Sequence, residues 1–372
     1  MKGRTCMMNK EVIMIRISLC MIVRDEEAVL GRLLEKVSPV MDEIVIVDTG
    51  SSDGTRDIAL KYTPLVFDFQ WKDDFAAARN FACEKASMEY WMWLDADDMI
   101  TDGNIERIRK LKEELESDTD VVMMKYAAGF DETGAASFSY YRERILRKAM
   151  GFVWKGRVHE AITPAGKIVH TDVEIEHRKE KAGDPDRNLR IYERMIAEGE
   201  SFDARSTFYY GRELLYHARY REAAAVLERF LDMKDGWNEN RIDACLQAAR
   251  CFEKTGDGER RIKLLLRSLL YDVPRAEICC ELGRALMEKN EFEMAAYWYA
   301  QALTAPERTE RGGFEQKEYH DFIPLVQLCI CYDRMGDLNA AWQYHLRAAV
   351  LRPDNEFVRI NQKYFEKALA AK

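Results

Sequence analysis

A change of pattern near residue 180 divides the sequence into two parts. In the first part, short apolar runs alternate with segments of about ten residues that have apolar positions at helical spacing. In the second part, the apolar positions have helical spacing throughout. A chain of 372 residues is long enough for two domains. We therefore expect an α/β domain at 15–179 and an all-α domain at 188–372, joined by a charged linker at 180–187.

The first part is typical of β-α-β units. Its expected strands lie at 17–23, 43–47, 65–69, 90–94 and 120–126. Its expected helices lie at 26–36, 55–62, 75–86 and 105–115. Strands that alternate with helices usually form a mostly parallel, Rossmann-like sheet with helices on both faces. Shorter β-like pieces, which we interpret as an antiparallel extension, follow at 138–142, 143–147, 152–155 and 173–177.

Polar clusters follow three of these expected strands, at 24–27, 48–53 and 95–98. Ligands of parallel α/β sheets bind beyond the carboxyl ends of the strands. The three clusters therefore predict a binding site at one edge of the sheet.

The last of these clusters is Asp95-Ala96-Asp97-Asp98, which follows an apolar strand that should be buried. Asp95 and Asp97 are one residue apart at a strand end, so their carboxylates project to the same side. Hard oxygen ligands suit Mg²⁺ or Mn²⁺, which often complete their shells with substrate phosphates. The alternative is a solvated turn that caps the next helix, but the buried strand before it favours a metal site.

Two other residues fit a nucleotide. Asp48 ends an expected strand, where its carboxylate could accept a hydrogen bond from a nucleobase or a ribose hydroxyl, while Ser52 or Asp53 caps the following helix. Arg79 lies in an alanine-rich helix, where an arginine needs an anionic partner. That partner is either the nucleotide or a nearby aspartate.

Four segments carry a family resemblance when taken in order: Leu19–Glu27, Asp48–Thr55, Asp74–Asn80 and Trp93–Asp97. Together they resemble the family-2 glycosyltransferases with a GT-A fold, and the resemblance covers residues 15–179. It implies inverting transfer of a sugar from a nucleotide diphospho-sugar, most often UDP-linked, with Mg²⁺ or Mn²⁺ as cofactor.

The resemblance also implies roles for individual residues. The donor-binding residues would be Val23, Glu26, Asp48, Asp53, Arg79, Asp95 and Ala96. Within this set, Val23 and Glu26 would flank the base and ribose, and Asp48 would contact the uracil. The metal ligands would be Asp95, Asp97 and His177, although a lone histidine is equally often structural.

Inverting transfer also needs a general base on the acceptor side of the sugar. The segment Trp154–Glu160 resembles a late motif of the same subgroup, so we expect Glu160 to be the base and His159 either to orient it or to contact a phosphate. Asp131 and Asp98 are the alternatives for the base. A surface ion pair is the structural interpretation of the His159–Glu160 pair.

The second part contains a repeat. Its first helices share a small residue at Gly211, Ala249, Gly283 and Cys329. Seven residues later, at an expected turn, stand Ala218, Gly256, Asn290 and Gly336. Twelve residues after the small residue stand Ala223, Arg261, Ala295 and Ala341, of which Arg261 breaks the pattern. The repeat resembles the tetratricopeptide repeat, whose period is about 34 residues and whose arrays often bind extended peptides. Packing on the catalytic domain and formation of a homodimer are the alternatives.

Composition limits the other classes of function. The net charge of −9 argues against nucleic acid as a partner. The apolar run at 13–23 is too short to cross a membrane and is broken by Arg16, so we expect a cytoplasmic protein with a disordered leader at 1–14. The nine cysteines lack the paired spacing of a zinc site, which favours reduced, buried thiols.

The leading hypothesis is a glycosyltransferase that modifies a peptide or protein side chain, similar to the bacterial subgroup that includes bacteriocin S-glycosyltransferases. A lipid or cell-envelope glycan is the alternative acceptor. A repeat scaffold with a decayed catalytic domain is a third hypothesis, and the intact Asp48, Arg79, Asp95 and Asp97 argue against it. A nucleotidyltransferase would carry a glycine-rich basic segment near the first strand, and 21–27 contains no glycine.

Overall fold

The computed structural model describes residues 14–130, 134, 136–178, 183–306 and 316–370. The chain divides into two compact units, residues 1–187 and 188–372. The expected leader lies almost wholly outside the described residues, as do Asp131 and the first part of the expected linker. None of the described helices is both long and apolar enough to span a bilayer.

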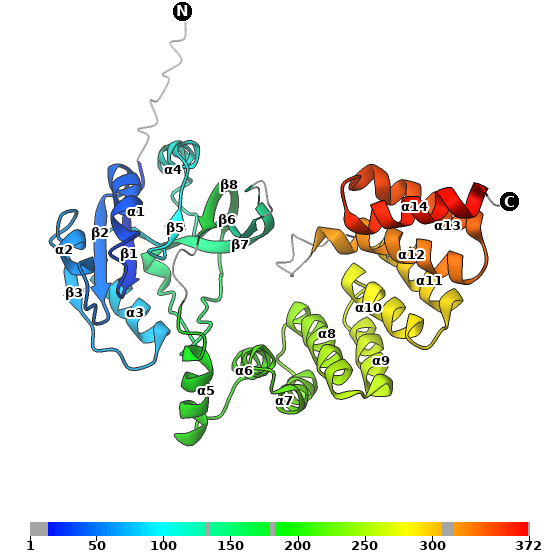
Figure 1. Ribbon diagram of the computed structural model, residues 1–372. Coiled ribbons are helices and arrows are strands. Elements are labelled where there is room, and N and C mark those ends of the chain that lie inside the picture. The colour runs from blue at the N-terminus through cyan, green and yellow to red at the C-terminus, as the bar shows by residue number, and fades with distance from the viewer. Residues whose placement is uncertain (1–13, 131–133, 135, 179–182, 307–315, 371–372) are drawn as a thin grey trace, which may run out of the picture. The chain divides into compact units, whose positions relative to one another are not determined.

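The described part of the first unit is built on one eight-stranded sheet with the order β3-β2-β1-β4-β7-β6-β8-β5 (Figure 1). The strands are β1 Ile17–Val23, β2 Glu43–Asp48, β3 Val66–Asp68, β4 Tyr90–Trp93, β5 Asp98–Met99, β6 Val121–Phe130, β7 Ala136–Arg147 and β8 Ile168–His177. β1 lies parallel to both β2 and β4, and β2 lies parallel to β3. The carboxyl ends of these four strands therefore meet at one edge of the sheet, as the sequence predicts.

The second half of the sheet differs in detail from the expectation. β6, the expected fifth strand, does not adjoin β4, because β7 lies between them and is antiparallel to both. The two pieces expected at 138–142 and 143–147 form the single strand β7. The piece expected at 152–155 is not a strand, since it forms only a Lys155–Ala161 bridge and is flanked by Gly151 and Gly156 with positive φ. The extension is also mixed, because β8 runs parallel to β6.

Helices cover both faces of this sheet. They are α1 Leu30–Val37, α2 Thr55–Ala59, α3 Phe75–Lys85 and α4 Asp102–Glu114. Leu19 and Met21 of β1 pack into one core with α1 and α4, whereas Cys20 points to the other face and packs with α3 and Trp93. The alternation of β1 side chains thus serves two cores, which is why the strand is apolar throughout.

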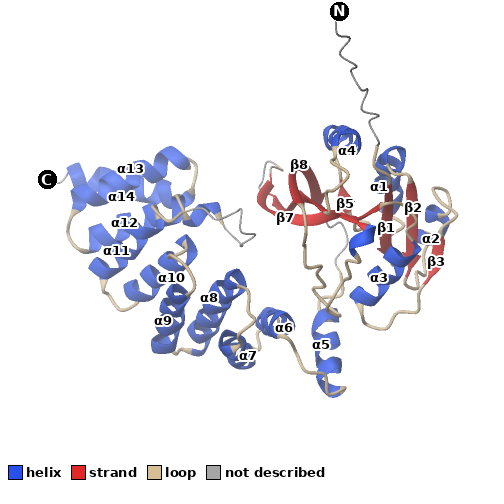
Figure 2. Ribbon diagram, turned by 180° about the vertical axis from the view of Figure 1, so that it is seen from behind, coloured by secondary structure: helices blue, strands red, loops and turns tan. Residues whose placement is uncertain are grey.

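The second unit is all-α, and Figure 2 shows that the described strands are confined to the first unit. Its helices are α5 Arg187–Ala197, α6 Ala204–Tyr216, α7 Tyr220–Asp232, α8 Asn238–Thr255, α9 Gly258–Arg267, α10 Ala276–Met287, α11 Phe292–Ala302, α12 Phe322–Arg334, α13 Leu338–Leu351 and α14 Glu356–Ala370. Four consecutive hairpins, α6–α7, α8–α9, α10–α11 and α12–α13, form a tetratricopeptide-like array. Each hairpin packs on its neighbours, as expected of a repeat protein.

Backbone geometry confirms the predicted register of the repeats. The four aligned turn residues all have left-handed backbones, with φ of 55° at Ala218, 79° at Gly256, 60° at Asn290 and 84° at Gly336. The small residue is required by close packing, because a Cβ on Gly283 would lie 2.7 Å from the Tyr299 ring. Sequence positions that repeat therefore occupy equivalent places in the structure.

Candidate functional site

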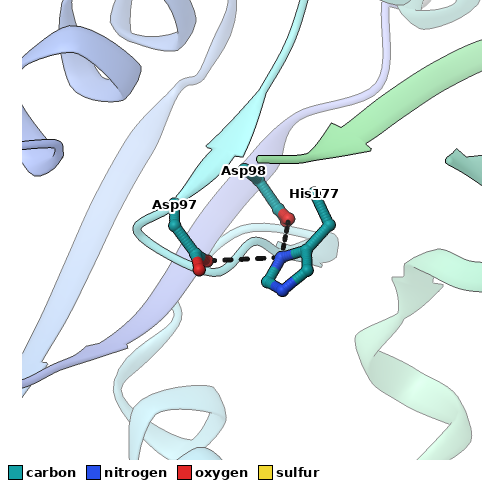
Figure 3. A group of neighbouring side chains, drawn as sticks. All are labelled: Asp97, Asp98 and His177. Atoms are coloured by element: carbon teal, nitrogen blue, oxygen red, sulfur yellow. Dashed lines mark ion pairs between the residues drawn. The ribbon is translucent and has the colours of Figure 1, made fainter. Parts of the chain in front are cut away.

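A group of three potential metal ligands lies beyond the end of β4 (Figure 3). Asp97 belongs to the loop after β4, Asp98 begins β5, and His177 ends β8. Because β5 and β8 pair with Asp98 opposite His177, the sheet itself brings these side chains together. His177 Nδ1 lies 3.4 Å from Asp97 Oδ1 and 3.6 Å from Asp98 Oδ1.

The chemistry of this group fits a divalent cation. One ligand atom from each residue lies within 4.8 Å of the others, and carboxylate oxygens with an imidazole nitrogen suit Mn²⁺ or Mg²⁺. His177 Nδ1 is buried and has no hydrogen-bond partner among the described residues. Burial and the neighbouring Asp95 and Asp98 raise the pKa of Asp97, and a bound cation would relieve this crowding of negative charge.

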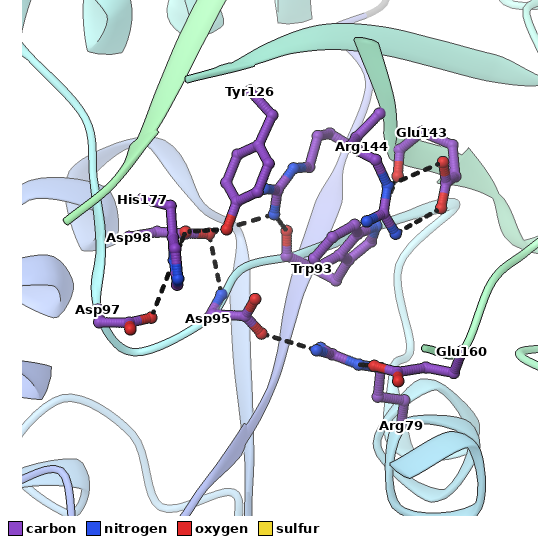
Figure 4. Close-up of polar contacts among 11 residues, drawn as sticks. Arg79, Trp93, Asp95, Asp97, Asp98, Tyr126, Glu143, Arg144, Glu160 and His177 are labelled. Atoms are coloured by element: carbon purple, nitrogen blue, oxygen red, sulfur yellow. Dashed lines mark hydrogen bonds and ion pairs between the residues drawn. The ribbon is translucent and has the colours of Figure 1, made fainter. Parts of the chain in front are cut away.

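A second cluster, centred on Arg79 of α3, adjoins the first (Figure 4). Arg79 Nη2 donates to Asp95 Oδ1 at 2.7 Å, and its Nε donates to Glu160 Oε1 at 2.6 Å. The guanidinium carbon lies 5.1 Å from the ring centroid of Trp93 and 4.9 Å from that of Trp154. The planar guanidinium therefore joins two carboxylates while it contacts two indole rings.

Arg79 keeps the Asp95 carboxyl ionised. Burial opposes ionisation of this carboxyl, but the charges of Arg79 and Arg144 outweigh it and hold the pKa of Asp95 at about 2. Asp95 is thus ion-paired with Arg79. The group of potential metal ligands contains Asp98, together with Asp97 and His177. The residues predicted to share the metal are divided between two neighbouring clusters.

The residues predicted for the acceptor side lie in the turn that leads to Glu160. Glu160 is largely buried, and within the described residues only its Oε1 accepts a hydrogen bond, from Arg79. His159 has a left-handed backbone with φ of 51°, which is uncommon for a residue with a side chain. The structure brings Glu160 into the site, and its role as base stays a prediction.

Sequence reasoning missed two buried residues behind the metal group, Arg144 of β7 and Tyr126 of β6. Arg144 Nη1 donates to Asp98 Oδ2 at 3.2 Å, and the Tyr126 hydroxyl donates to Asp98 Oδ1 at 3.1 Å. The signal for Arg144 was an arginine next to the apolar residues Ile145 and Leu146 of the same strand. A charged residue so placed needs a buried partner, but the sequence does not show which one.

The loops after β1 and β2 are joined by reciprocal hydrogen bonds. Residues 24–29 and 49–55 are together called the donor wall, after the role that the sequence predicts for them. Asp25 N donates to Ser51 Oγ at 3.0 Å, and Ser52 N donates to Asp25 Oδ1 at 2.6 Å. In the same way, Glu27 N donates to Asp53 Oδ2, while Gly54 N donates to Glu27 Oε2. The helix expected from residue 26 begins only at Leu30, after a turn in which Val29 N donates to the Glu26 carbonyl.

Four of the seven predicted donor-binding residues lie on this wall or at the ends of the two strands that lead into it. Val23 and Asp48 are opposite each other in the register of β1 and β2, and Ala96 is buried in the loop after β4. Asp48 is buried and uses Oδ1 to accept from Gly50 N and Ser51 N, which fixes the start of its own loop. Glu26 and Asp53 hold the wall together: Glu26 N donates to Thr55 Oγ1, and Asp53 Oδ1 accepts from Thr55 N.

Among solved structures, the chain is similar to YrrB, described as a tetratricopeptide repeat protein with an unusual peptide-binding site. The identity is 16%, the TM-score is 0.37, and the match covers 48% of this chain and 84% of that one. The type IV pilus biogenesis factor PilW matches at 20% identity and a TM-score of 0.38, over 48% of this chain and 74% of that one.

The match to a known family lies within the first unit. Residues 18–169 match the family described as glycosyl transferase family 2. A TPR repeat-containing protein of Synechococcus elongatus is 33% identical over 40% of this chain and 36% of its own length. The lipopolysaccharide core biosynthesis glycosyltransferase LpsC of Rhizobium meliloti is 29% identical over 41% and 58%. The glycosyltransferase SunS of Bacillus subtilis is 27% identical over 60% and 55%. The chain thus spans between about a third and three fifths of the length of these relatives.

Proposed function

We propose that the protein transfers a sugar from a nucleotide diphospho-sugar, on the premise that residues 18–169 are a glycosyl transferase family 2 domain. One observation carries the proposal: the potential metal ligands Asp97, Asp98 and His177 adjoin the Arg79 cluster at the edge of the sheet where the donor wall also lies. Cation ligands, an arginine and a rigid loop wall are the parts that recognition of a nucleotide diphosphate requires.

The donor in this proposal is a UDP-sugar. Val23, Asp48 and Ala96 line the base and ribose side, while Glu26 and Asp53 support it through the hydrogen bonds of the donor wall. Both bonds within the Asp48 loop use Oδ1, so Oδ2 is the oxygen that we assign to the uracil. Arg79, oriented by Asp95, faces the diphosphate or the ribose.

Mg²⁺ or Mn²⁺ would be held by Asp97, Asp98 and His177, with Asp95 adjacent. When bound, such a cation neutralises the charge that develops on the departing diphosphate. The residues of the chain supply the rest: they orient the donor, and we assign proton removal from the acceptor to Glu160. Arg79 fixes Oε1 of Glu160, which leaves Oε2 to take the proton in an inverting reaction.

We assign the acceptor to a peptide or protein side chain, bound with the help of the tetratricopeptide-like array and modified in the cytoplasm. The array offers a row of equivalent hairpins, the arrangement with which such repeats bind extended segments. Self-association through the array is the other use that we consider. A second acceptor, a lipid or cell-envelope glycan, is favoured by the name of the relative LpsC.

The test is release of UDP or GDP from a panel of nucleotide sugars, with Mn²⁺ or Mg²⁺ and with a chelator. We expect one UDP-sugar to be turned over, and we expect both the chelator and Asp97→Asn to reduce the rate by about a hundredfold or more. Asp102→Asn is the matched control, because Asp102 is an exposed aspartate at the start of α4. Absence of turnover and of nucleotide binding across the panel would refute the proposal, and equal loss in both variants would refute the role of Asp97.

A further inference from the structure

Arg144 is a fully buried cation that, among the described residues, uses only one of its three nitrogens for hydrogen bonds. Nη1 donates to the Trp93 carbonyl at 3.1 Å and to Asp98 Oδ2 at 3.2 Å. Within the described residues, Nε and Nη2 have no hydrogen-bond partner. The guanidinium carbon lies 3.7 Å from the ring centroid of Trp93 and 4.4 Å from that of Tyr126. The charge is therefore held between two aromatic rings and paired with one carboxylate.

Such an arrangement is unfavourable for stability alone. A buried charge with unbonded nitrogens has lost its hydration, and the contacts with the two rings offset only part of that loss. A well-packed apolar pair could fill the same space without this desolvation cost. What Arg144 contributes must therefore be sought in the residue that it contacts, Asp98.

Asp98 is held from three directions, as Figure 4 shows. Arg144 and the Asp95 backbone N–H, at 3.2 and 3.0 Å, both donate to Oδ2, and the Tyr126 hydroxyl donates to Oδ1 at 3.1 Å. The side chain has no exposed surface, yet Oδ1 lies 3.6 Å from His177 Nδ1. Asp98 is thus a fixed carboxylate at the back of the potential metal group, whereas Asp97 is partly exposed at the front.

We propose that Arg144 and Tyr126 are positioning residues for the divalent cation: they clamp Asp98 in the orientation that the cation requires. This inference rests on the metal site of the proposed function. Lysine could not replace Arg144, because a single ammonium group cannot lie flat between two rings while it bonds the Trp93 carbonyl and Asp98. Outer residues that orient a ligand commonly change metal affinity by about 10- to 100-fold.

Arg142, on the same strand, provides a matched control. Its guanidinium carbon lies 4.8 Å from the ring centroid of Trp93, but its hydrogen bonds go to the side chain of Glu143. Arg142→Lys therefore alters the surroundings of the same indole without touching Asp98. Arg144→Lys and Tyr126→Phe alter the clamp, the second by removing one hydroxyl group.

The experiment measures binding of Mn²⁺ to the full chain, without nucleotide, from the electron paramagnetic resonance signal of the free ion. We expect Arg144→Lys to weaken binding about tenfold or more, Tyr126→Phe severalfold, and Arg142→Lys less than twofold. Thermal unfolding identifies any variant that does not fold. If Arg144→Lys does not fold, the Mn²⁺ affinity of Tyr126→Phe alone tests the clamp.

Unchanged affinity in both clamp variants would overturn the inference. Equal weakening in all three variants would also overturn it, because the effect would then belong to the surroundings of Trp93. If the wild-type protein binds no Mn²⁺, the metal site of the proposed function fails, and that result is distinct from failure of the clamp. Selective weakening in the two clamp variants would support the positioning role.

Discussion

Charged side chains are buried in both units, but they are placed differently. In the first unit, one group of them lies at the carboxyl edge of the sheet, where Arg79 joins Asp95 to Glu160 and Arg144 holds Asp98. In the second unit they connect successive hairpins. Arg261 of α9 donates to Glu281 of α10 at 3.5 Å and to Glu288, directly after α10, at 2.7 Å. Arg284 of α10 pairs with Glu253 of α8.

The difference separates two uses of buried charge. Between hairpins, Arg261 and Arg284 each pair with a carboxylate of a neighbouring hairpin, so these ion pairs hold the stack together. At the edge of the sheet, the carboxylates of Asp97 and Asp98 crowd around His177, and the charge of Asp95 acts on them as well. Such crowding of like charges is typical of a functional site, whereas unbonded buried atoms are not specific to it, since among the described residues they occur both at Arg144 Nε and at Arg241 Nε of the repeats. We therefore expect changes in the first set to affect activity and changes in the second set to affect stability.

The largest expected effect comes from Arg79→Lys. Lysine keeps the charge but cannot bond Asp95 and Glu160 together while it contacts two indoles. We expect kcat/KM for the donor sugar to fall by about a hundredfold or more, since small displacements of catalytic groups have effects of this size. Steady-state kinetics, with the nucleotide sugar that the wild-type protein turns over, would measure the fall in kcat/KM.

Arg284→Lys is the counterpart in the repeats, because Arg284 also bridges two carboxylates, those of Glu253 and Glu281. We expect it to lower the unfolding midpoint and to leave donor turnover within twofold of wild type. If Arg284→Lys loses donor turnover, or if Arg79→Lys retains it, the charged residues at the sheet edge and those between the hairpins do not have separate roles.

Gly283→Ala has the next largest effect, this time on stability alone. The added Cβ would lie 2.7 Å from Tyr299, whose ring is buried and cannot move away easily. Overpacking of this kind typically costs about 1–3 kcal/mol in the free energy of unfolding. Denaturant titration of the variant would measure the loss. In Gly258→Ala the new methyl group meets no atom within 4 Å, so that control should unfold at the wild-type denaturant concentration or above.

The smallest effect concerns the pH dependence of the Glu253–Arg284 pair. Hydrogen bonds from Arg284 lower the pKa of Glu253 from 4.5 to about 2. A carboxylate with a lowered pKa stabilises the fold above its unfolded pKa, and this contribution is lost as the pH falls from 4.5 toward 2. Glu253→Gln should therefore lower stability by about 1 kcal/mol at pH 7, because the pair is partly exposed and screened. The difference should vanish near pH 2; a constant difference across this range would contradict the assigned pKa.

Local patterns predicted the first half of the sheet and the repeats well. Continuous apolar runs identified β1 and β2, and the seven-residue spacing from Gly283 to Asn290 identified a turn that all four hairpins share. Both signals depend on residues close together in the sequence. The position of β7 between β4 and β6 does not, because it is set by long-range pairing.

At the candidate site, too, the sequence indicated local features but not long-range contacts. Polar residues at strand ends indicated where side chains would gather, and Val23 and Asp48 do lie opposite each other. The partners could not be predicted, because Arg79 reaches Glu160 across 81 residues and Arg144 reaches Asp98 across 46. Arg261 broke the repeat pattern for a similar reason, since its partners belong to the following hairpin.

The hydrogen bonds of the donor wall bear on any attempt to change the nucleotide preference of the proposed reaction. Because Asp25 and Glu27 of one loop exchange hydrogen bonds with Ser52, Asp53 and Gly54 of the other, the two loops behave as a single folded piece. A substitution in one loop alone would leave polar groups of the other without partners. Engineering of nucleotide preference should therefore exchange 24–29 and 49–55 together, as one cassette taken from a relative with a different donor.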